Sequence, residues 1–453
     1  MQQQISIRGR GLTIAGTALA CVLSFALSSC KSSKPEAALD RDVREYVRLA
    51  VGLGQRDPDS LDFYSAPESQ VADVVKQSPS LKAIRASAIQ LLQKVQQEQP
   101  VRDEDKSRKA FLEQQLRALA SRVDILTGVP SSFDDESRSS FGVVVPASYD
   151  RSAVTAVQAE LQQLLPGKGD LAERYQSFDD RFIIPAKLVP VVMARAIEAC
   201  RAETKAHVAL PAGESTTVEY VRNRPWSAFS WYKGNYHSVI QVNRDFAMTV
   251  DRALNLACHE AYPGHHTYNS VRDAKLVQGK GLTEYSVQPT FSPQSMLSES
   301  IATLAVDVAF PMEKRLVFER DVLFPMAGLD GKDAALYLKI EGLVDRLHTV
   351  EPSIAREYLD GRLEFERAGA ELQSTALMAH PEAALLYMNE YRSYVTTYTY
   401  GRDLVAEQLQ QRSGGDREAQ WMVYAQWMNE DPQLRGMHHE AGNPGALSHV
   451  GGG

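Results

Sequence analysis

The stretch Cys258-His259-Glu260-Ala261-Tyr262-Pro263-Gly264-His265-His266 decides how the middle of this 453-residue chain folds. It places three imidazoles and a carboxylate within eight residues, around a Pro-Gly pair. Proline lacks a backbone N–H and clashes with the preceding helical turn, and glycine adopts conformations that other residues avoid. We therefore expect a helix that ends or bulges at Pro263 and Gly264.

The spacing of the histidines differs from the usual zinc-binding pattern. In an HExxH helix, two histidines four residues apart chelate zinc and the glutamate activates water. Here Pro263 occupies the position of the second histidine. In an unbroken helix the later imidazoles would lie roughly 9 to 10 Å from His259, too far to share one ion. If the Pro-Gly pair loops out of the helix, one of these imidazoles moves back towards His259 by about one helical turn. We expect His265 to be the second ligand, with His266 as the alternative ligand or as a substrate contact.

The HEAYPGHH element resembles the HExxPGHH signature of the DUF885 family of bacterial proteins, which is placed among gluzincin-like metallopeptidases. The resemblance extends over residues 40–430 and includes the run Arg-Val-Asp-Ile-Leu-Thr-Gly at 122–128 and the Tyr-Gly pair at 400–401. It implies a third metal ligand on a later helix, which we assign to Glu299. Ser300 and Ile301 stand where the family usually has glycine and tryptophan, so this part of the match is incomplete.

Two imidazoles and one carboxylate would leave a zinc ion with a net positive charge and an open position for water. With the resemblance, this implies a zinc-dependent peptidase in which Glu260 is the general base and the partner is a peptide or small amide. Other divalent ions accept the same ligands. Two alternatives stay open: a metal-dependent hydrolase of a non-peptide amide or ester, and a non-catalytic metal-binding lipoprotein.

Residues 389–402 carry four tyrosines and two arginines. A hydrogen-bond donor aimed at the developing oxyanion is expected in such a site. By analogy with the late tyrosines of related gluzincins, we assign catalytic roles to Tyr400 and Arg402, and a substrate contact to Tyr398. The alternative is that these tyrosines are half-buried packing residues. Arg402, Arg392 or a lysine is a candidate to hold a substrate's terminal carboxylate.

Residues 236–243 mix aromatic, polar and β-branched side chains, which predicts a strand at the margin of a small sheet, with 215–220 and 228–232 as partners. A marginal strand binds extended peptides through its backbone. His237 and Asn243 are therefore predicted substrate contacts, and the alternative is a purely structural hairpin.

The N-terminus has the features of a secretory signal. Arg8 and Arg10 precede a nearly uncharged apolar run at 11–29, and Leu-Ser-Ser-Cys ends at Cys30. This ending resembles a bacterial lipobox, which implies lipidation of Cys30 and an exported protein anchored in the cell envelope, at the outer membrane if the host is Gram-negative. The alternative is a transmembrane anchor.

The mature chain has two further cysteines, Cys200 and Cys258. In an oxidising compartment they are a possible disulfide, and the alternative for Cys258 is a packed thiol behind the metal site. A ligand role for Cys258 is disfavoured, because adjacent side chains on a helix point about 100° apart.

Composition indicates a large globular body. The chain is 44% hydrophobic and 23% charged, with a net charge of −8, which disfavours a nucleic-acid partner. Apolar residues recur at helical spacing. Predicted helices cover 81–97, 103–127, 152–165, 188–205, 333–347, 353–368, 381–387, 400–412 and 419–428, with a metal-binding helix from Met248 and a Glu299 helix from Ser295.

We therefore expect a mainly α-helical (α+β) fold. The resemblance implies a zincin-like metallopeptidase architecture, with a deep helical cleft and a small antiparallel sheet beside the metal helix. We divide the chain into a lipoprotein signal peptide (1–29), a tether (30–40), an N-terminal helical scaffold (41–166), a metal-binding catalytic region in one body with the scaffold (167–432) and a disordered tail (433–453).

Overall fold

The computed structural model describes residues 38–65 and 67–429. The predicted signal peptide, the lipidation site Cys30 and the predicted tail lie outside these residues. The described chain is mainly helical with two small sheets, which confirms the α+β class. Within it, no helix combines the length and the apolar character that a membrane span requires.

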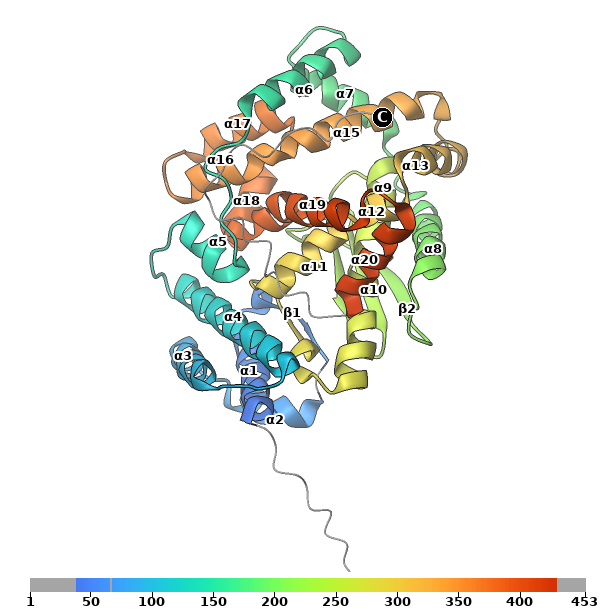
Figure 1. Ribbon diagram of the computed structural model, residues 1–453. Helices are drawn as coiled ribbons and strands as arrows, with labels where there is room; N and C mark the ends of the chain where they lie inside the picture. The colour runs from blue at the N-terminus through green and yellow to red at the C-terminus, as the bar shows by residue number, and fades with distance from the viewer. Residues whose placement is uncertain (1–37, 66, 430–453) are drawn as a thin grey trace, which may run out of the picture. The chain divides into compact units, whose positions relative to one another are not determined.

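The first four helices pack against one another (Figure 1). They are α1 (Ala38–Gly54), α2 (Glu68–Gln77), α3 (Leu81–Gln97) and α4 (Asp103–Leu126). The buried residues of α3 recur every three or four positions, which is the apolar spacing that predicted this helix: Ile84, Ala88, Leu91, Leu92 and Val95. Their core also receives Leu276, Leu282, Tyr285 and Val287 from the middle of the chain.

The next helices, α5 (Phe133–Phe141), α6 (Arg151–Leu164), α7 (Leu171–Asp179) and α8 (Val189–His207), belong mostly to a second and larger core. Phe133 of α5 and Leu161 of α6 are fully buried there. The predicted scaffold at 41–166 is therefore divided between these two cores and a smaller third cluster, which contains Phe141 of α5.

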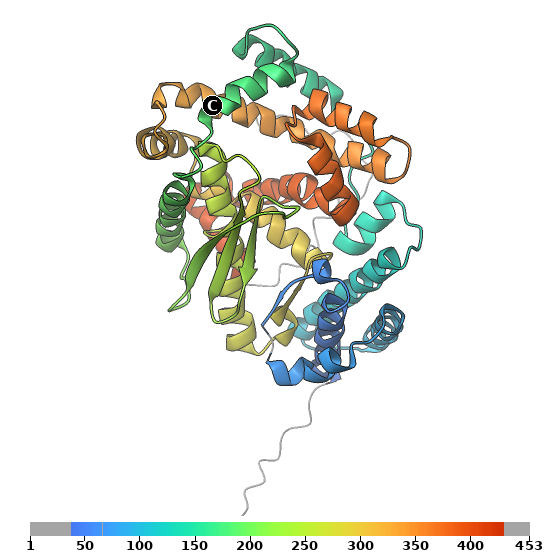
Figure 2. The ribbon, with the colours of Figure 1, turned by 180° about the vertical axis from the view of Figure 1, so that it is seen from behind.

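The larger sheet has three strands, β2 (Ser215–Val221), β3 (Ala228–Tyr232) and β4 (His237–Asn243), in the order β2-β4-β3 (Figure 2). The partner segments of the predicted strand are thus confirmed, but its marginal position is wrong. The chain inserts β4 between the two earlier strands, so β4 pairs parallel with β2 and antiparallel with β3. The sheet is mixed and not antiparallel. Both edges of β4 form backbone hydrogen bonds with neighbouring strands.

A second sheet joins distant parts of the chain. Strand β1 (Leu61–Tyr64) pairs antiparallel with β5 (Val287–Pro289). Nearby, Arg108 of α4 donates two hydrogen bonds to Glu284, at 2.5 and 3.0 Å, and both side chains are buried. These contacts hold the N-terminal helices against the segment that leads into the Glu299 helix.

The central helices are α9 (Val250–Glu260), α10 (His265–Arg272) and α11 (Pro293–Thr303). The π-helix η9 (Thr397–Gly401), from a later part of the chain, packs against α11. The start of α11 is well defined, because Pro293 occupies its first turn and the Ser292 hydroxyl accepts a hydrogen bond from the Ser295 amide at 3.1 Å. A Cβ on Gly401 would collide with Ser300 and Met296, so glycine lets η9 approach α11 closely.

The single predicted helix at 353–368 is wrong. The chain turns at Gly361, which has a φ of 73°, and forms α16 (Glu351–Leu359) and α17 (Phe365–Ala376). The other long C-terminal helices are α15 (Ala334–Leu347), α18 (Pro381–Tyr391), α19 (Arg402–Ser413) and α20 (Arg417–Asn429). Shorter helices are η1 (Pro58–Ser60), η2 (Asp180–Phe182), η3 (Asp273–Gln278), η4 (Thr283–Ser286), α12 (Ala305–Ala309), α13 (Met312–Phe318), η5 (Glu319–Leu323), α14 (Phe324–Ala327), η6 (Gly331–Asp333), η7 (His348–Val350) and η8 (Arg392–Tyr394).

Candidate metal centre

The predicted helix break lies between α9 and α10. Helix α9 ends at Glu260, the Tyr262–Pro263 peptide is cis, and α10 begins at His265. The Gly264 amide donates to the Cys258 carbonyl at 3.0 Å. A Cβ at Gly264 would overlap the carbonyl oxygen of His259, so only glycine fits this position. The Pro-Gly pair thus folds the chain back onto the end of α9.

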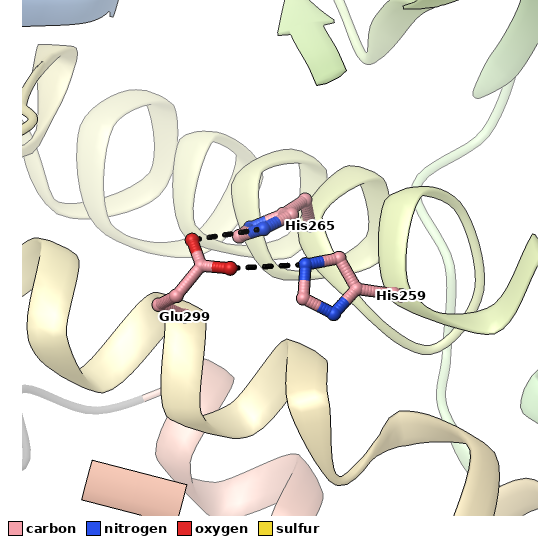
Figure 3. Close-up of side chains that lie close together, drawn as sticks. All are labelled: His259, His265 and Glu299. Atoms are coloured by element: carbon pink, nitrogen blue, oxygen red, sulfur yellow. Dashed lines mark ion pairs between the residues drawn. The ribbon is translucent and has the colours of Figure 1, made fainter. Parts of the chain in front are cut away.

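This turn brings two imidazoles to one carboxylate, as Figure 3 shows. The Nε2 atom of His259 lies 3.0 Å from one oxygen of Glu299, and the Nε2 atom of His265 lies 3.4 Å from the other. One ligand atom from each of the three residues lies within 4.8 Å of the other two. The structure therefore gathers the three residues that the sequence predicted as ligands, from three different helices.

The charges of these groups are strongly coupled. Burial alone would raise the pKa of Glu299, but the imidazoles of His265 and His259 hold it well below its ordinary value. Burial alone would lower the pKa of His265, but the Glu299 carboxylate raises it to about 9. A buried carboxylate that attracts two imidazoles provides the negative charge that a cation at this place requires.

The set of donors fits a zinc ion. Two imidazole nitrogens and a carboxylate oxygen are common zinc ligands, and a three-residue set is typical of catalytic sites. Neighbouring groups orient these ligands: the Ser298 hydroxyl lies 3.3 Å from His265 Nδ1, and the Tyr394 hydroxyl donates to Glu299 at 3.0 Å. Burial raises the pKa of Tyr394 well above its ordinary value, so its hydroxyl keeps the proton that it donates.

Glu260 is buried, and its carboxyl group lies within electrostatic range of His259, His265 and Glu299. Burial raises the pKa of its carboxyl group above the ordinary value, and the imidazoles of His259 and His265 oppose this shift. Among residues 38–65 and 67–429, no hydrogen-bond or ion-pair partner of its carboxylate is found. Glu260 is therefore available to interact with water or substrate.

His266 is neither a ligand nor accessible to substrate, so both interpretations of this residue are wrong. Its side chain is fully buried, with Nδ1 2.8 Å from the Ser238 hydroxyl and Nε2 3.0 Å from the Glu214 carboxylate. The Tyr262 hydroxyl donates to the same Glu214 oxygen at 2.5 Å. Burial would raise the pKa of Glu214, but its hydrogen bonds to His266, Tyr262 and Arg201 lower it to about 2. Glu214 therefore bridges the residues on the two sides of the Pro-Gly turn.

The two predicted substrate contacts on β4 have structural partners. Asn243 is buried, and its amide donates to the carbonyls of Arg224 and Trp226, both at 3.0 Å. The prediction for Asn243 is therefore wrong, because the loop before β3 occupies its side chain. His237 is partly exposed at the start of β4, where its Nδ1 lies 3.0 Å from the Ser215 hydroxyl of the parallel neighbour β2.

The late tyrosines are distributed differently from the prediction. Tyr394, and not Tyr400, contacts Glu299. Arg402 forms ion pairs with Asp345 at 2.7 Å and Asp307 at 3.6 Å, so its guanidinium is not among the polar contacts of the three ligands. Tyr400 packs against the larger core and lies near Asp403 and Glu407. Tyr398 is close enough to Glu299 for the carboxylate charge to raise its pKa, after the larger effect of burial.

Asp62 of β1 was not predicted. It accepts a hydrogen bond from Thr290 at 2.8 Å. Burial and the Glu299 charge raise the pKa of Asp62 to about 7, against the effect of Thr290. No local motif marks this residue, because strand pairing between β1 and β5 brings it near the ligands from a distant part of the sequence.

The predicted disulfide is present. Cys200 of α8 is bonded to Cys258 of α9, and both residues are fully buried. Cys258 directly precedes His259, so the bond fixes the end of α9 that carries this candidate ligand.

No protein-family model matches the chain, and no curated protein matches it. Among solved structures, it is similar to a predicted lipoprotein from Colwellia psychrerythraea, with 14% identity and a TM-score of 0.46 over 88% of this chain and 78% of that one. It is also similar to a predicted lipoprotein of unknown function from Shewanella oneidensis, with 14% identity and a TM-score of 0.42 over 86% of this chain and 83% of that one. At these values the likeness determines neither the fold family nor the activity.

Proposed function

We propose that the protein is a zinc-dependent, metallopeptidase-like hydrolase related to the DUF885 family. One observation carries this proposal: Glu260 has no partner among the described residues and lies beside the convergent side chains of His259, His265 and Glu299. A metal-ligating set with an adjacent unpaired carboxylate is the arrangement that metal-assisted hydrolysis requires.

His259, His265 and Glu299 would hold the ion. When bound, zinc supplies a Lewis acid that polarises a carbonyl group and lowers the pKa of water. The Glu260 carboxylate then accepts a proton from the attacking water and returns it to the leaving amine. Burial favours this transfer, since it raises the pKa of Glu260 towards the working pH. Tyr394 holds the Glu299 carboxylate in place, and Tyr398 is the proposed substrate contact.

The same chemistry supports hydrolysis of a non-peptide amide or ester as the second candidate. A closed structural site is less well supported, because such sites usually have four protein ligands. Among the described residues, the group around Glu299 contains three. We further propose that the zincin-like architecture places the substrate beside α9, and that lipidation of Cys30 anchors the protein in the cell envelope.

The test combines metal analysis with cleavage assays. Protein purified without added metal is analysed for bound ions, loaded with zinc and incubated with a peptide library that is read by mass spectrometry. We expect Glu260→Gln to retain zinc but to cleave about 10² to 10⁴ times more slowly, which is the usual contribution of a general base. Glu219→Gln, at an exposed position of β2, is the matched control and should behave like the parent.

Equal cleavage by Glu260→Gln and the parent would show that Glu260 is not the base. If no peptide is cleaved, a panel of amides and esters tests the second candidate in the same pair of proteins. Zinc binding without hydrolysis of either panel would leave the non-catalytic lipoprotein as the correct interpretation.

A further inference from the structure

Arg252 shares a helix face with the first metal ligand. It lies on α9, seven residues before His259. Seven residues make almost two full turns, so the two side chains leave the helix in nearly the same direction, roughly 10 Å apart along the axis. A positive charge at Arg252 therefore faces the same side of α9 as the candidate metal centre.

The guanidinium of Arg252 has no carboxylate partner among residues 38–65 and 67–429. Its described hydrogen bond is from Nη2 to the Ser227 hydroxyl, at 2.8 Å. The adjacent acid, Asp251, is instead paired with Arg315. Five N–H groups in a planar fork are well suited to a carboxylate, and one hydroxyl satisfies only a small part of this capacity.

The Arg252 guanidinium is accessible to an anion from solvent. The side chain is exposed to solvent, yet the protein around it lowers its pKa through desolvation, against the negative charges of Glu260 and Asp251. The charge of Arg252 also acts on His348 of η7, whose ring is paired with the Glu351 carboxylate. A cation that is accessible but poorly hydrated binds an anion more strongly than one in bulk water.

The two arginines first considered for this role are already neutralised. Arg392 is paired with the buried carboxylate of Glu136 at 2.6 Å. Arg402 is paired with Asp345 at 2.7 Å. Arg252 is therefore a better candidate than either for binding an anionic group of a ligand.

We propose that Arg252 binds a carboxylate of the substrate, namely the free C-terminal carboxylate of a short peptide. This inference rests on the proposed function, since it places the cleaved bond at His259, His265 and Glu299. The separation of roughly 10 Å corresponds to about three extended residues. The protein would therefore release fragments of about one to three residues from the C-terminus of its substrates.

A binding experiment tests the contact without any turnover. Cobalt-loaded protein is titrated with linear dicarboxylates from succinate to sebacate, each compared with its monoamide, and binding is followed by the visible spectrum of the cobalt. We expect the best-fitting dicarboxylate to bind about ten times more tightly than its monoamide, or better, as is usual for a charge-assisted hydrogen bond. Arg252→Gln should abolish this difference, and Arg252→Lys should retain part of it.

Arg362→Gln is the matched control, because Arg362 is an exposed arginine paired with Glu357 and Asp360, and it should bind like the parent. Thermal unfolding and cobalt content establish that each variant is folded and loaded. Equal binding of dicarboxylate and monoamide by the parent, or an unchanged preference in Arg252→Gln, would overturn the inference while leaving the metal centre intact. A parent protein that binds no cobalt would overturn both proposals.

The cleavage assay provides a second measurement. Each peptide that the zinc-loaded parent cleaves is compared with its C-terminal amide. The inference predicts cleavage near the C-terminus, with kcat/KM at least about tenfold lower for the amide, and loss of this preference in Arg252→Gln. Cleavage at internal bonds with equal rates for acid and amide would contradict it.

Discussion

His265 and His266 are neighbours with opposite environments. His265 meets Glu299 at the centre, whereas His266 is fully buried between Ser238 and Glu214. His265 therefore faces the candidate metal centre, whereas His266 connects the turn to the sheet through its contact with Ser238. Two residues of one type, adjacent in the sequence, contribute to different properties of the molecule.

Alanine substitutions should separate these properties. His265→Ala is expected to abolish tight zinc binding and to remove the stability that the ion pair with Glu299 contributes to the metal-free fold. His266→Ala should leave zinc binding measurable but lower the free energy of unfolding by about 1 to 3 kcal/mol, because Glu214 and Ser238 lose a buried partner. Zinc competition with a chromophoric chelator and urea unfolding of the metal-free proteins measure the two effects. Loss of zinc in His266→Ala alone would reverse the assignment.

The coupling of His265 and Glu299 predicts a dependence on pH. In the metal-free protein, the pKa of His265 is raised from 6.5 to about 9, so the ion pair contributes its full stability below pH 6.5 and loses it as the pH rises to about 9. Zinc requires neutral imidazoles, so its affinity should increase over the same range. Urea unfolding of the parent and of His265→Gln, with and without zinc, tests both trends. A metal-free parent whose stability relative to His265→Gln stays constant would contradict this coupling.

The sequence was sufficient to select His259 as a candidate ligand and Glu260 as the candidate base, because the helix break and the HEAYPGHH element are local, whereas Glu299 followed from the family resemblance. It did not decide between His265 and His266, since that choice depends on the backbone geometry of Gly264. Neither Asp62 nor Tyr394 could be selected, because tertiary contacts bring both residues towards Glu299.

At the scale of elements, Glu214 links α8, the sheet and the turn between α9 and α10. It precedes β2, pairs with Arg201 of α8 and accepts hydrogen bonds from Tyr262 and His266. The turn that presents His265 is thus held on both sides by one carboxylate. We therefore expect Glu214 to position His265, the second candidate ligand.

Glu214→Gln should weaken zinc binding about 10- to 100-fold, the usual effect of removing a group that orients a metal ligand. The amide preserves the size of the side chain but cannot accept from Tyr262, His266 and Arg201 in the same way. Competition titrations at a temperature where the variant is fully folded separate this effect from global stability. Glu219→Gln on β2 serves again as the control, and equal zinc affinities for both variants would show that Glu214 has only a structural role.

Most helices were predictable as elements, because their apolar spacing is local, as in α3. The order of the strands in the larger sheet was not predictable from the sequence. Hydrophobic pattern and turn residues indicate where strands form, but they do not specify that β4 lies between β2 and β3 in a sheet that contacts α9 and α10. The same limit explains why residues 353–368 were predicted as one helix, since the turn at Gly361 interrupts an otherwise continuous apolar pattern.

At the scale of the whole described chain, zinc would connect α9, α10 and α11. Binding to the folded state alone stabilises it, by about 4 kcal/mol when free zinc exceeds the dissociation constant a thousandfold. We expect the melting temperature to fall on chelation and to recover on addition of zinc. His259→Ala should show the low melting temperature in both conditions, and a zinc-dependent increase in this variant would locate the binding elsewhere.

The bond between Cys200 and Cys258 has a practical consequence for how the protein is prepared. Both sulfurs are shielded from solvent once α8 and α9 have packed. Reductants added afterwards therefore reach them slowly, and oxidants reach them equally slowly if the thiols were buried unpaired. Protein made in a reducing cytosol would thus keep Cys200 and Cys258 as thiols, and protein made in an oxidising periplasm would keep the disulfide. The compartment of synthesis, and not the assay buffer, would determine which form is present.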